Sequence, residues 1–371
     1  MGKRKRQMKW YTKVWAFPLM LVNFFASIVF ILCAFSHYIP AAKFPVISLA
    51  GLAFPFALAA VVAFLVFWFV FYRRYCWLSF LTLLICSWEI YTMCPINLKR
   101  QIPPKEGFKV LSYNVYSGNV TSSNVKKDNE VLNYIGKLDA DIVCLQECNN
   151  EAFRAYEKED GWMHKYPYRS YDVGNYSSPK GHLVVCLSKY PILSRRIVSF
   201  EGSDNGAQVY EILVEGDTVA LFNCHLQSFG LNDEDKDAYN DILTRPKDNV
   251  ATSRTKTLVK KLRDAGVKRA LQADGLRKEI DECSAPYIIV CGDFNDTPLS
   301  YTHHVLTRKL SDAHTRSGNG FDFSYNRNHM YFRIDHILAS RNLTPYACKV
   351  DRSIKISDHY PIHCTFVKKE K

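Results

Sequence analysis

Hydrophobic and polar positions divide the chain into two parts with different patterns. In residues 1–106, long uncharged blocks rich in Phe, Leu, Ile, Val and Ala are separated by basic residues. In residues 107–371, short apolar runs alternate with polar segments. The first pattern is typical of membrane-spanning helices, and the second is typical of a globular domain that mixes strands and helices.

The apolar blocks of the first part predict a membrane anchor over residues 1–100. We predict three transmembrane helices, which cover about residues 14–39, 45–72 and 76–97. The first two blocks lie within uncharged stretches of 29 residues each, and a helix needs roughly 20 apolar residues to cross a bilayer. The third block is weaker because it carries Glu89, which is interpreted either as a carboxylate at the lipid headgroups or as a functional group within the membrane.

Basic residues around the three blocks predict the orientation of the anchor. The first connection contains only Lys43, whereas the second contains Arg73 and Arg74. The segment before the first block carries Lys3, Arg4, Lys5, Arg6, Lys9 and Lys13. The positive-inside rule then places the N-terminus in the cytoplasm and the rest of the chain after the third helix on the periplasmic side of a bacterial inner membrane. If the third block is only interfacial, that remainder stays in the cytoplasm.

The second part predicts one mixed domain over residues 108–371, after a linker at 101–107. Helical periodicity covers 128–138 and recurs around 252–280. Strand-like apolar runs cover 108–115, 141–147, 183–188, 208–214, 218–225, 287–292, 334–339 and 361–367. Strands and helices that follow one another in this way indicate an α/β or α+β fold.

The net charge changes meaning once it is divided between the two parts. The whole chain carries +12, which by itself suggests a nucleic-acid partner. Residues 1–106 hold 12 lysines and arginines against two acids, a net +10, and residues 107–371 hold 36 against 34, a net +2. Most of the positive charge therefore describes orientation in the membrane. A nucleic-acid substrate stays open, but the charge of the domain does not indicate one.

Cysteine usage neither suggests a zinc site nor agrees simply with the predicted orientation. None of the twelve cysteines belongs to a CxxC pair, which disfavours structural zinc. Eight cysteines lie in the second part, several of them inside strand-like runs where a thiol acts as a small buried apolar group. Eight free thiols are typical of a reducing compartment, so they argue against the periplasmic side.

Polar residues gather where the predicted strands begin or end. They are Asn114, Glu147, His225, Asp293 with Asn295, Asp335, and Asp358 with His359. Oxygen ligands of this kind suit Mg²⁺ or another hard cation, and such a cation beside Asp and His is suited to phosphoryl chemistry. Taken singly, each Asn or Asp is also a common turn former after a strand.

The motifs around these residues, SYNV, LQE, HLQ, GDFNDTP, RIDHI and SDHYPI, resemble in order those of the endonuclease/exonuclease/phosphatase superfamily, which includes deoxyribonuclease I-like enzymes. The resemblance covers about residues 108–367. It implies a four-layer sandwich of two packed mixed β-sheets flanked by helices, here preceded by an all-α transmembrane region. It further implies hydrolysis of a phosphate ester with Mg²⁺ or Mn²⁺. The apolar N-terminal part resembles that of membrane-anchored bacterial members.

The resemblance also implies roles around the metal ion and the substrate. Glu147 matches the direct metal ligand, Asn114 matches a neighbour that supports metal and phosphate, and Asp358 matches a second carboxylate on the metal side. Three further residues are candidates for substrate binding: His182, Arg333 and Tyr116. Arg333 has an equally good alternative, in which it only bridges a carboxylate.

Five residues match the catalytic positions of the superfamily. Asp293 and Asn295 match the pair that positions the attacking water and a phosphate oxygen. His225 matches the residue that stabilises charge developing on the phosphate. Asp335 and His359 match an Asp–His couple, in which the carboxylate fixes the tautomer of the imidazole or stabilises the imidazolium. The sequence leaves open whether His359 or Asp293 is the general base.

These observations favour a membrane-anchored, metal-dependent phosphodiesterase or phosphatase that acts on lipid headgroups or other phosphate esters near the membrane. The alternative is a tethered Mg²⁺-dependent endonuclease or exonuclease. A catalytically silent binding module is less favoured, because all motif residues are present. The expected partners are the lipid bilayer and the phosphate-ester substrate, with no obligate protein partner.

Overall fold

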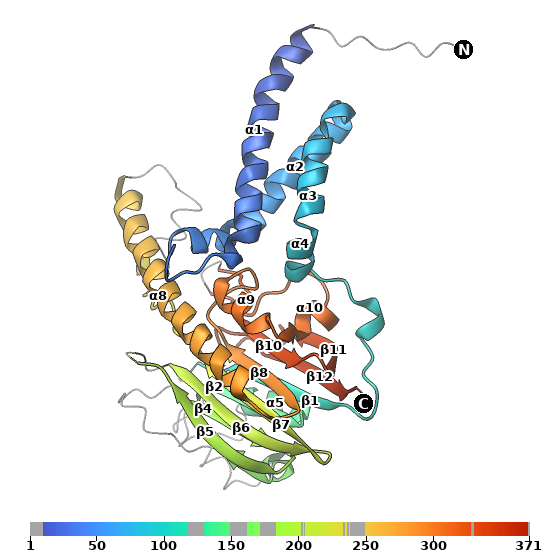
Figure 1. Cartoon of the computed structure of the whole chain (residues 1–371), viewed down its shortest axis with the longest axis vertical. Coiled ribbons are helices and arrows are strands. Elements are labelled where there is room, and N and C mark those ends of the chain that lie inside the picture. Colours follow the sequence, from blue (N-terminus) through green and yellow to red (C-terminus); the bar gives the residue numbers. More distant parts are fainter. Residues whose placement is uncertain are drawn as a thin grey trace, which may run out of the picture.

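A computed structural model shows a helical N-terminal part followed by two packed β-sheets with helices outside them (Figure 1). The structure describes residues 10–116, 130–148, 162–170, 183–201, 203, 205–232, 234–235, 237, 249–327 and 330–369. The chain therefore has the two parts that the hydrophobic pattern predicts.

The helical part contains two helical stretches that are long and apolar enough to cross a membrane, Ala16–Tyr38 and Ile47–Phe71. The third predicted span consists of two helices that bend by 62° at a break after Ile85, so it passes the same test only when the pair counts as one broken span. The α-helices are α1 (Trp10–Phe35), α2 (Phe54–Phe71), α3 (Trp77–Ile85) and α4 (Ser87–Met93), and the short 3₁₀ helices are η1 (Ser36–Tyr38), η2 (Ile47–Ala53), η3 (Arg73–Tyr75) and η4 (Leu98–Arg100).

The helices of this part pack through a small apolar cluster and one buried polar contact. Phe30 of α1 packs against Phe54 of α2, with ring centroids 5.1 Å apart. The Ser79 hydroxyl of α3 donates to Asn23 Oδ1 of α1 over 3.0 Å, a type of contact that links helices in lipid. Large apolar side chains such as Phe71 point outward and are mostly exposed, as expected for a surface that lipid covers.

The course of the chain brings three ends of these helices to the β-sandwich. The C-terminal end of α1, the start of α2 and the end of α4 all lie beside it, whereas η3, which connects α2 to α3, lies at the opposite end (Figure 1). At the junction, the ring of His37 lies 5.2 Å from that of His304, and Asn97 Nδ2 donates to the carbonyl oxygens of Thr315 and Gly318. The helical part is thus in direct contact with the sandwich.

The sandwich consists of two six-stranded mixed sheets. The first has the order β11-β12-β1-β2-β4-β3 and the second has the order β5-β6-β7-β8-β10-β9. The strands of the first sheet are β1 (Phe108–Asn114), β2 (Ile142–Cys148), β3 (Tyr168–Ser170), β4 (Leu183–Ser188), β11 (Leu343–Val350) and β12 (Ile362–Lys368). Those of the second are β5 (Ile192–Ser199), β6 (Gly206–Val214), β7 (Asp217–His225), β8 (Tyr287–Asp293), β9 (Leu310–Asp312) and β10 (Asp335–Ser340).

Helices cover the outer faces of both sheets. Val131 and Ile135 of α5 (Glu130–Leu138) pack on the first sheet, and Leu276 and Ile280 of α8 (Asn249–Glu282) pack on the second. Two short helices, α9 (Tyr301–Thr307) and α10 (Ala313–Ser317), and the 3₁₀ helix η6 (Trp162–Lys165) complete the described elements. A third apolar cluster lies between the sheets, so the predicted four-layer sandwich is confirmed.

Candidate active site

The polar residues at the ends of the central strands of both sheets lie together at one edge of the sandwich. In the first sheet β1 and β2 run parallel, so Asn114 and Glu147 leave the sheet side by side. In the second sheet β7 and β8 run parallel with His225 opposite Asp293, and antiparallel β10 places Asp335 opposite Asp293 as well. Because parallel strands end at the same edge, residues far apart in the sequence meet there.

Gly292 allows the close approach of β7 and β8 next to Asp293. Its φ is +134°, and a Cβ atom at this position would lie 1.9 Å from the carbonyl oxygen of Cys224 on β7. Only glycine fits such a position without displacing backbone. The glycine of the GDFND motif is therefore required by the packing of the two strands that carry His225 and Asp293.

Three residues of the site adopt left-handed backbone conformations that side chains rarely take. The φ angles are +45° for Tyr116, +51° for Glu147 and +52° for Asn295. The pairing of β2 with β4 shifts register between Leu145 and Cys148, which re-aims the Glu147 side chain. Local strain of this kind persists where the surrounding structure holds it, and it is common at functional sites.

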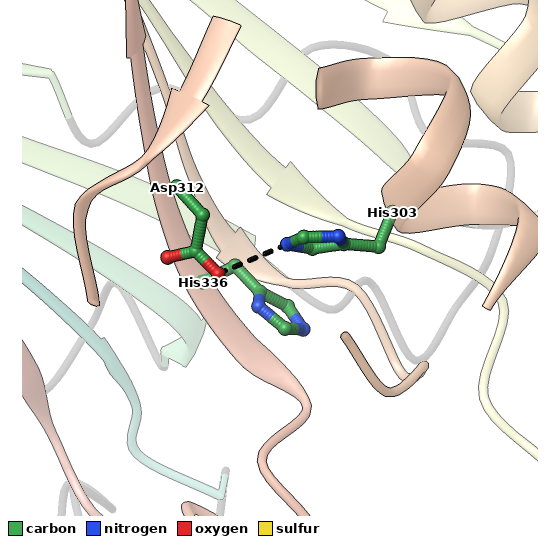
Figure 2. A group of neighbouring side chains, drawn as sticks. All are labelled: His303, Asp312 and His336. Atoms are coloured by element: carbon green, nitrogen blue, oxygen red, sulfur yellow. Dashed lines mark hydrogen bonds and ion pairs between the residues drawn. The ribbon is translucent and has the colours of Figure 1, made fainter. Parts of the chain in front are cut away.

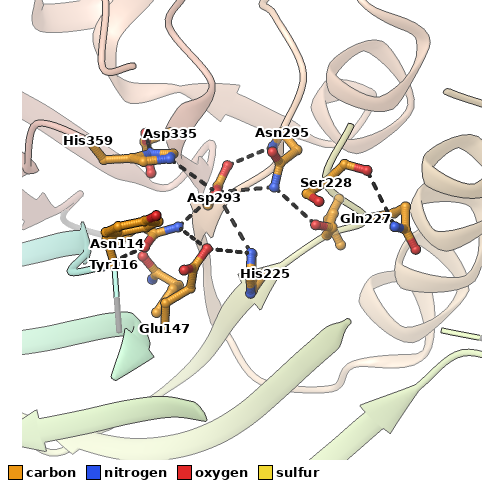
Figure 3. Close-up of polar contacts among 12 residues, drawn as sticks. Asn114, Tyr116, Glu147, His225, Gln227, Ser228, Asp293, Asn295, Asp335 and His359 are labelled. Atoms are coloured by element: carbon orange, nitrogen blue, oxygen red, sulfur yellow. Dashed lines mark hydrogen bonds and ion pairs between the residues drawn. The ribbon is translucent and has the colours of Figure 1, made fainter. Parts of the chain in front are cut away.

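Two carboxylates converge on the side-chain amide of Asn114 (Figure 3). Asn114 Nδ2 donates to Glu147 Oε1 over 3.1 Å and to Asp293 Oδ2 over 3.0 Å, while Asn114 Oδ1 accepts from the backbone N–H of Tyr116. His225 Nε2 faces both carboxylates, at 3.5 Å from Glu147 Oε1 and 3.9 Å from Asp293 Oδ2. Asn114 thus orients the two acids with its amide N–H groups.

The chemistry of this donor set fits a divalent cation. Within the described residues, neither Glu147 nor Asp293 forms an ion pair with a lysine or arginine. Glu147, His225 and Asp293 offer ligand atoms that lie within 4.8 Å of one another, and burial of negative charge without a counter-ion is costly. Carboxylate oxygens are the preferred ligands of Mg²⁺ and Mn²⁺, so these residues fit the predicted metal.

Asp335 and His359 form a buried pair beside the carboxylates. His359 Nδ1 lies 2.8 Å from Asp335 Oδ2, and His359 Nε2 points to Asp293 Oδ2 at 3.7 Å. Burial alone would lower the pKa of His359, but the Asp335 and Asp293 carboxylates outweigh burial and raise it to about 10. The two carboxylates thus favour the protonated form of the imidazole, whose Nε2 faces the site.

Asp293 occupies the centre of the cluster and is held from several sides. Burial raises the pKa of Asp293, against the opposing effect of His359. The backbone N–H of Asn295 donates to Asp293 Oδ1 over 2.8 Å, and Asn295 Nδ2 donates to Asp293 Oδ2 and to the carbonyl oxygen of Leu226. Asn295 consequently connects Asp293 to the end of the strand that carries His225.

The remaining predicted site residues lie in different places. Asp358 is half-buried next to His359, and burial raises the pKa of its carboxyl group. The side chain of Tyr116 is 51% exposed beside Asn114, so a substrate could reach it. Arg333 is not brought to the cluster, because its guanidinium is buried and pairs with Asp312 over 2.9 Å. His182 lies outside the described residues.

Arg333 belongs to a second polar cluster, together with His303, Asp312 and His336, and Figure 2 shows the last three of these residues. His303 Nε2 and Arg333 both contact Asp312 Oδ2, and Arg333 donates to His336 Nδ1 over 3.2 Å. His336 Nε2 lies 2.8 Å from the carbonyl oxygen of Asp296. His303, Asp312 and His336 are close enough to hold a metal ion. However, the Arg333 guanidinium already balances the charge of Asp312 and hydrogen-bonds to both Asp312 and His336. The group is therefore better explained as a structural hydrogen-bond network.

Two residues that the sequence analysis did not single out support the site. The Ser357 hydroxyl donates to the carbonyl oxygen of Asn114 and accepts from the backbone N–H of His359, which fixes two site residues to each other. Arg269 of α8 donates to the carbonyl oxygen of Gln227 and pairs with Asp296. Ser357 precedes Asp358 in the SDHYPI motif, but nothing in the pattern distinguishes Arg269 from the exposed basic residues of the same helix.

The layered fold, with carboxylates and imidazoles gathered at one edge of two packed sheets, is that of a phosphoesterase. A model of the endonuclease/exonuclease/phosphatase family matches residues 111–359, two thirds of the chain, and the chain belongs to this family. A second model, described as a domain of unknown function, matches residues 16–93 of the helical part. No curated protein matches the chain.

Solved structures share the fold at low sequence identity. An endonuclease/exonuclease/phosphatase protein from Bacteroides vulgatus is 16% identical with a TM-score of 0.52, and the match covers 71% of this chain and 99% of that one. The mannosyl-6-phosphatase of Bacteroides thetaiotaomicron is 16% identical with a TM-score of 0.49, over 70% and 99% of the two chains. TDP2 of D. rerio, humanized by 14 mutations, is 17% identical with a TM-score of 0.49, over 71% and 100%. The likeness to the Bacteroides vulgatus protein bears on the fold, and the substrate remains undetermined.

Proposed function

We propose that the protein is a membrane-anchored hydrolase of phosphate esters that depends on a divalent metal ion, Mg²⁺ or Mn²⁺. The observation that supports this most directly is the convergence of Glu147 and Asp293 on Asn114, opposite His225 and within reach of the His359–Asp335 pair. Carboxylates that pair with no lysine or arginine among the described residues, beside two histidines, suit a metal ion and a phosphate group together.

In this proposal, each residue of the cluster has a distinct role in hydrolysis. Glu147 and Asp293 hold the metal ion, with Asn114 orienting both carboxylates and Asp358 adding negative charge on the same side. When bound, the ion withdraws charge from the phosphate oxygens and favours attack by water. His359, held by Asp335, donates a hydrogen bond to a phosphate oxygen, and His225 stabilises charge on the same group. Asn295 holds the Asp293 carboxylate in place through its backbone N–H and its side-chain amide.

The helical part supports a proposal about location. Since η3 with Arg73 and Arg74 lies at the end of the helices away from the sandwich, the positive-inside rule places the sandwich on the non-cytoplasmic side. The helices then hold the sandwich next to the bilayer, which favours a lipid headgroup or another membrane-proximal phosphate ester as substrate. The near-neutral charge of residues 107–371 does not favour nucleic acid.

The test is a panel of phosphate esters with the purified full-length protein in detergent. The panel contains phospholipids with different headgroups, a sugar phosphate, plasmid DNA and a chromogenic phosphodiester. We expect Mg²⁺-dependent hydrolysis of at least one phospholipid or small ester, and its loss on chelation of the metal. Glu147→Gln, which keeps the shape and removes the charge, should lower kcat at least about 10²-fold.

The control is Glu106→Gln, an exposed carboxylate of the linker, which should behave as the wild type. Cleavage of plasmid DNA together with inactivity on all other esters would select the nuclease alternative. If wild type and Glu147→Gln were equally inert on every ester with either metal ion, the enzyme proposal would fail and a binding module would remain.

A further inference from the structure

A cavity of about 560 Å³ lies where the helical part meets the sandwich. Its walls come from η1 and α4 on one side, and from α9, β9, α10 and the segments next to them on the other. None of the proposed catalytic or metal-binding residues lines it. Its volume is within the range of roughly 300–1,000 Å³ that small-molecule sites occupy in proteins.

The α4 wall contributes a buried carboxylate of which one oxygen lacks a hydrogen-bond partner. Glu89 is 3% exposed, and its Oε2 atom has no donor among the described residues. Leaving a buried carboxylate oxygen without a donor costs free energy, and more so at the edge of a membrane. Glu89 Oε2 can therefore accept a hydrogen bond from a cationic or hydrogen-bond-donating ligand in the cavity.

Aromatic rings also line the cavity. The rings of His37, Tyr38 and His304 pack on one another, with centroids 4.1 to 5.2 Å apart, and all three residues line the cavity. Trp88, the neighbour of Glu89, also lines it and is 60% exposed. Aromatic faces beside a carboxylate are the surroundings that attract an ammonium group.

The wall on the side of the sandwich is basic. Arg316, Arg341 and Lys369 line it, from α10, from the turn before β11 and from the segment after β12. Arg341 donates one hydrogen bond to the carbonyl oxygen of Arg308, and Lys369 Nζ donates one to the carbonyl oxygen of Arg341. A guanidinium has five N–H donors and an ammonium has three, so both side chains retain donors for a phosphate group.

We propose that this cavity binds a phosphate group that carries an ammonium, as in the headgroup of an aminophospholipid. The ammonium lies against Glu89 and the aromatic rings, and the phosphate lies against Arg316, Arg341 and Lys369. The mostly exposed apolar faces of the neighbouring helices make the host membrane the natural source of this group. The site is separate from the proposed catalytic cluster, so it does not depend on the proposed activity.

The experiment measures lipid binding by the full-length protein in detergent with native mass spectrometry. Phosphatidylethanolamine and phosphatidylglycerol with identical acyl chains are compared, because both carry the phosphate and only the first carries an ammonium. We expect about tenfold tighter binding of phosphatidylethanolamine, and in Glu89→Gln we expect the two lipids to bind within about twofold of each other. Glu106→Gln should keep the preference of the wild type.

Two further experiments identify the source of the ligand and provide a second variant in case Glu89→Gln does not fold. Displacement of the lipid by O-phosphoethanolamine would assign the free compound, whereas its failure to displace would assign the membrane lipid. If Glu89→Gln does not fold, the double variant Arg341→Gln/Lys369→Gln should weaken both lipids alike by about tenfold. Equal binding of both lipids by the wild type, or an unchanged preference in Glu89→Gln, would overturn the proposal.

Discussion

Arg269 is a fully buried charge in the middle of α8, and it holds two loops of the active site together. Its guanidinium donates to the carbonyl oxygen of Gln227, pairs with Asp296 and lies 4.1 Å from the centre of the Phe229 ring. Gln227 follows the strand of His225, and Asp296 follows Asn295. The side chain of Arg269 therefore positions residues on both sides of the proposed catalytic cluster without touching the substrate.

Arg269→Ala should lower kcat of the proposed hydrolysis by about 10- to 100-fold with a small change in KM, because small displacements of aligned groups are costly. The measurement is steady-state kinetics on the ester that the substrate panel identifies. Addition of guanidinium should restore part of the activity. Lys268→Ala, at an exposed neighbour on the same helix, is the matched control. An unchanged kcat in a folded Arg269→Ala protein would contradict the positioning role.

The lowered pKa of His336 implies that the stability of the sandwich depends on pH. Burial lowers the pKa of His336, Arg333 and His303 lower it further, and Asp312 opposes them. The pKa of a histidine side chain in the unfolded chain is about 6.5. Below that pH, His336 binds a proton in the unfolded chain but stays neutral in the folded protein. Stability is thus complete above pH 6.5 and falls as the pH decreases toward the lowered folded pKa.

His336→Gln should make this acid-dependent loss shallower, since glutamine can accept from Arg333 and donate to the carbonyl oxygen of Asp296 without titrating. Thermal unfolding midpoints of wild type and variant, measured from pH 7.5 to pH 5, test this. Parallel curves for the two proteins would show that the titration of His336 makes no contribution.

The sequence pattern predicted the central strands of the two sheets but not the edge strands. All eight strand-like runs of the sequence became strands, and each of them lies inside a sheet. The four strands that the pattern did not predict are β3, β5, β9 and β11, which are the four edges. An edge strand pairs on one side only and tolerates charged residues and proline, such as Arg195, Arg196 and Pro345, so its sequence lacks the apolar run of a central strand.

At the scale of two neighbouring elements, Gly292→Ala should be strongly destabilising. The new methyl group would collide with the backbone of β7, and overpacking of this kind typically costs about 1–3 kcal/mol or more. Gly216→Ala is the control, because Gly216 also has a positive φ of +85° but has open space around it. The urea midpoints of the two variants separate the collision from the backbone strain, and equal midpoints would contradict the steric explanation.

The whole molecule is organised around the contact between its helical part and its sandwich. Asn97, Gln101 and Pro95 of the connecting segment hydrogen-bond to residues of the sandwich from Thr315 to Gly320. His37 of η1 meets His304 of α9 in the same region. The segment that the sequence suggested as a linker, 101–107, thus continues a connection that holds the sandwich against the helical part.

Reporter fusions test the orientation that follows from this arrangement. In a bacterial host, alkaline phosphatase fused after Lys371 should be active and a green fluorescent protein there should be dark, because the sandwich is expected outside the cytoplasm. Fusions after Arg74 should show the opposite pattern. A fluorescent fusion after Lys371 would contradict the orientation and would agree with the free thiols of the sandwich.

The sequence by itself determined the division into an apolar helical part and a mixed domain, the central strands and the candidate residues for a metal and phosphate site. These properties follow from local patterns, because burial imposes a period on each element and chemistry imposes residue types at strand ends. The resemblance added the four-layer order of the sandwich.

Only the tertiary structure decided which polar residues meet. Asn114 and Asp293 are 179 positions apart, and a hydrogen bond between them depends on the packing of two sheets. The burial of Arg333 with Asp312, the role of Arg269 and the cavity at Glu89 depend likewise on contacts between distant segments. No local pattern records such contacts, because the free energy of a buried charge depends on its partners in space rather than on its neighbours in the chain.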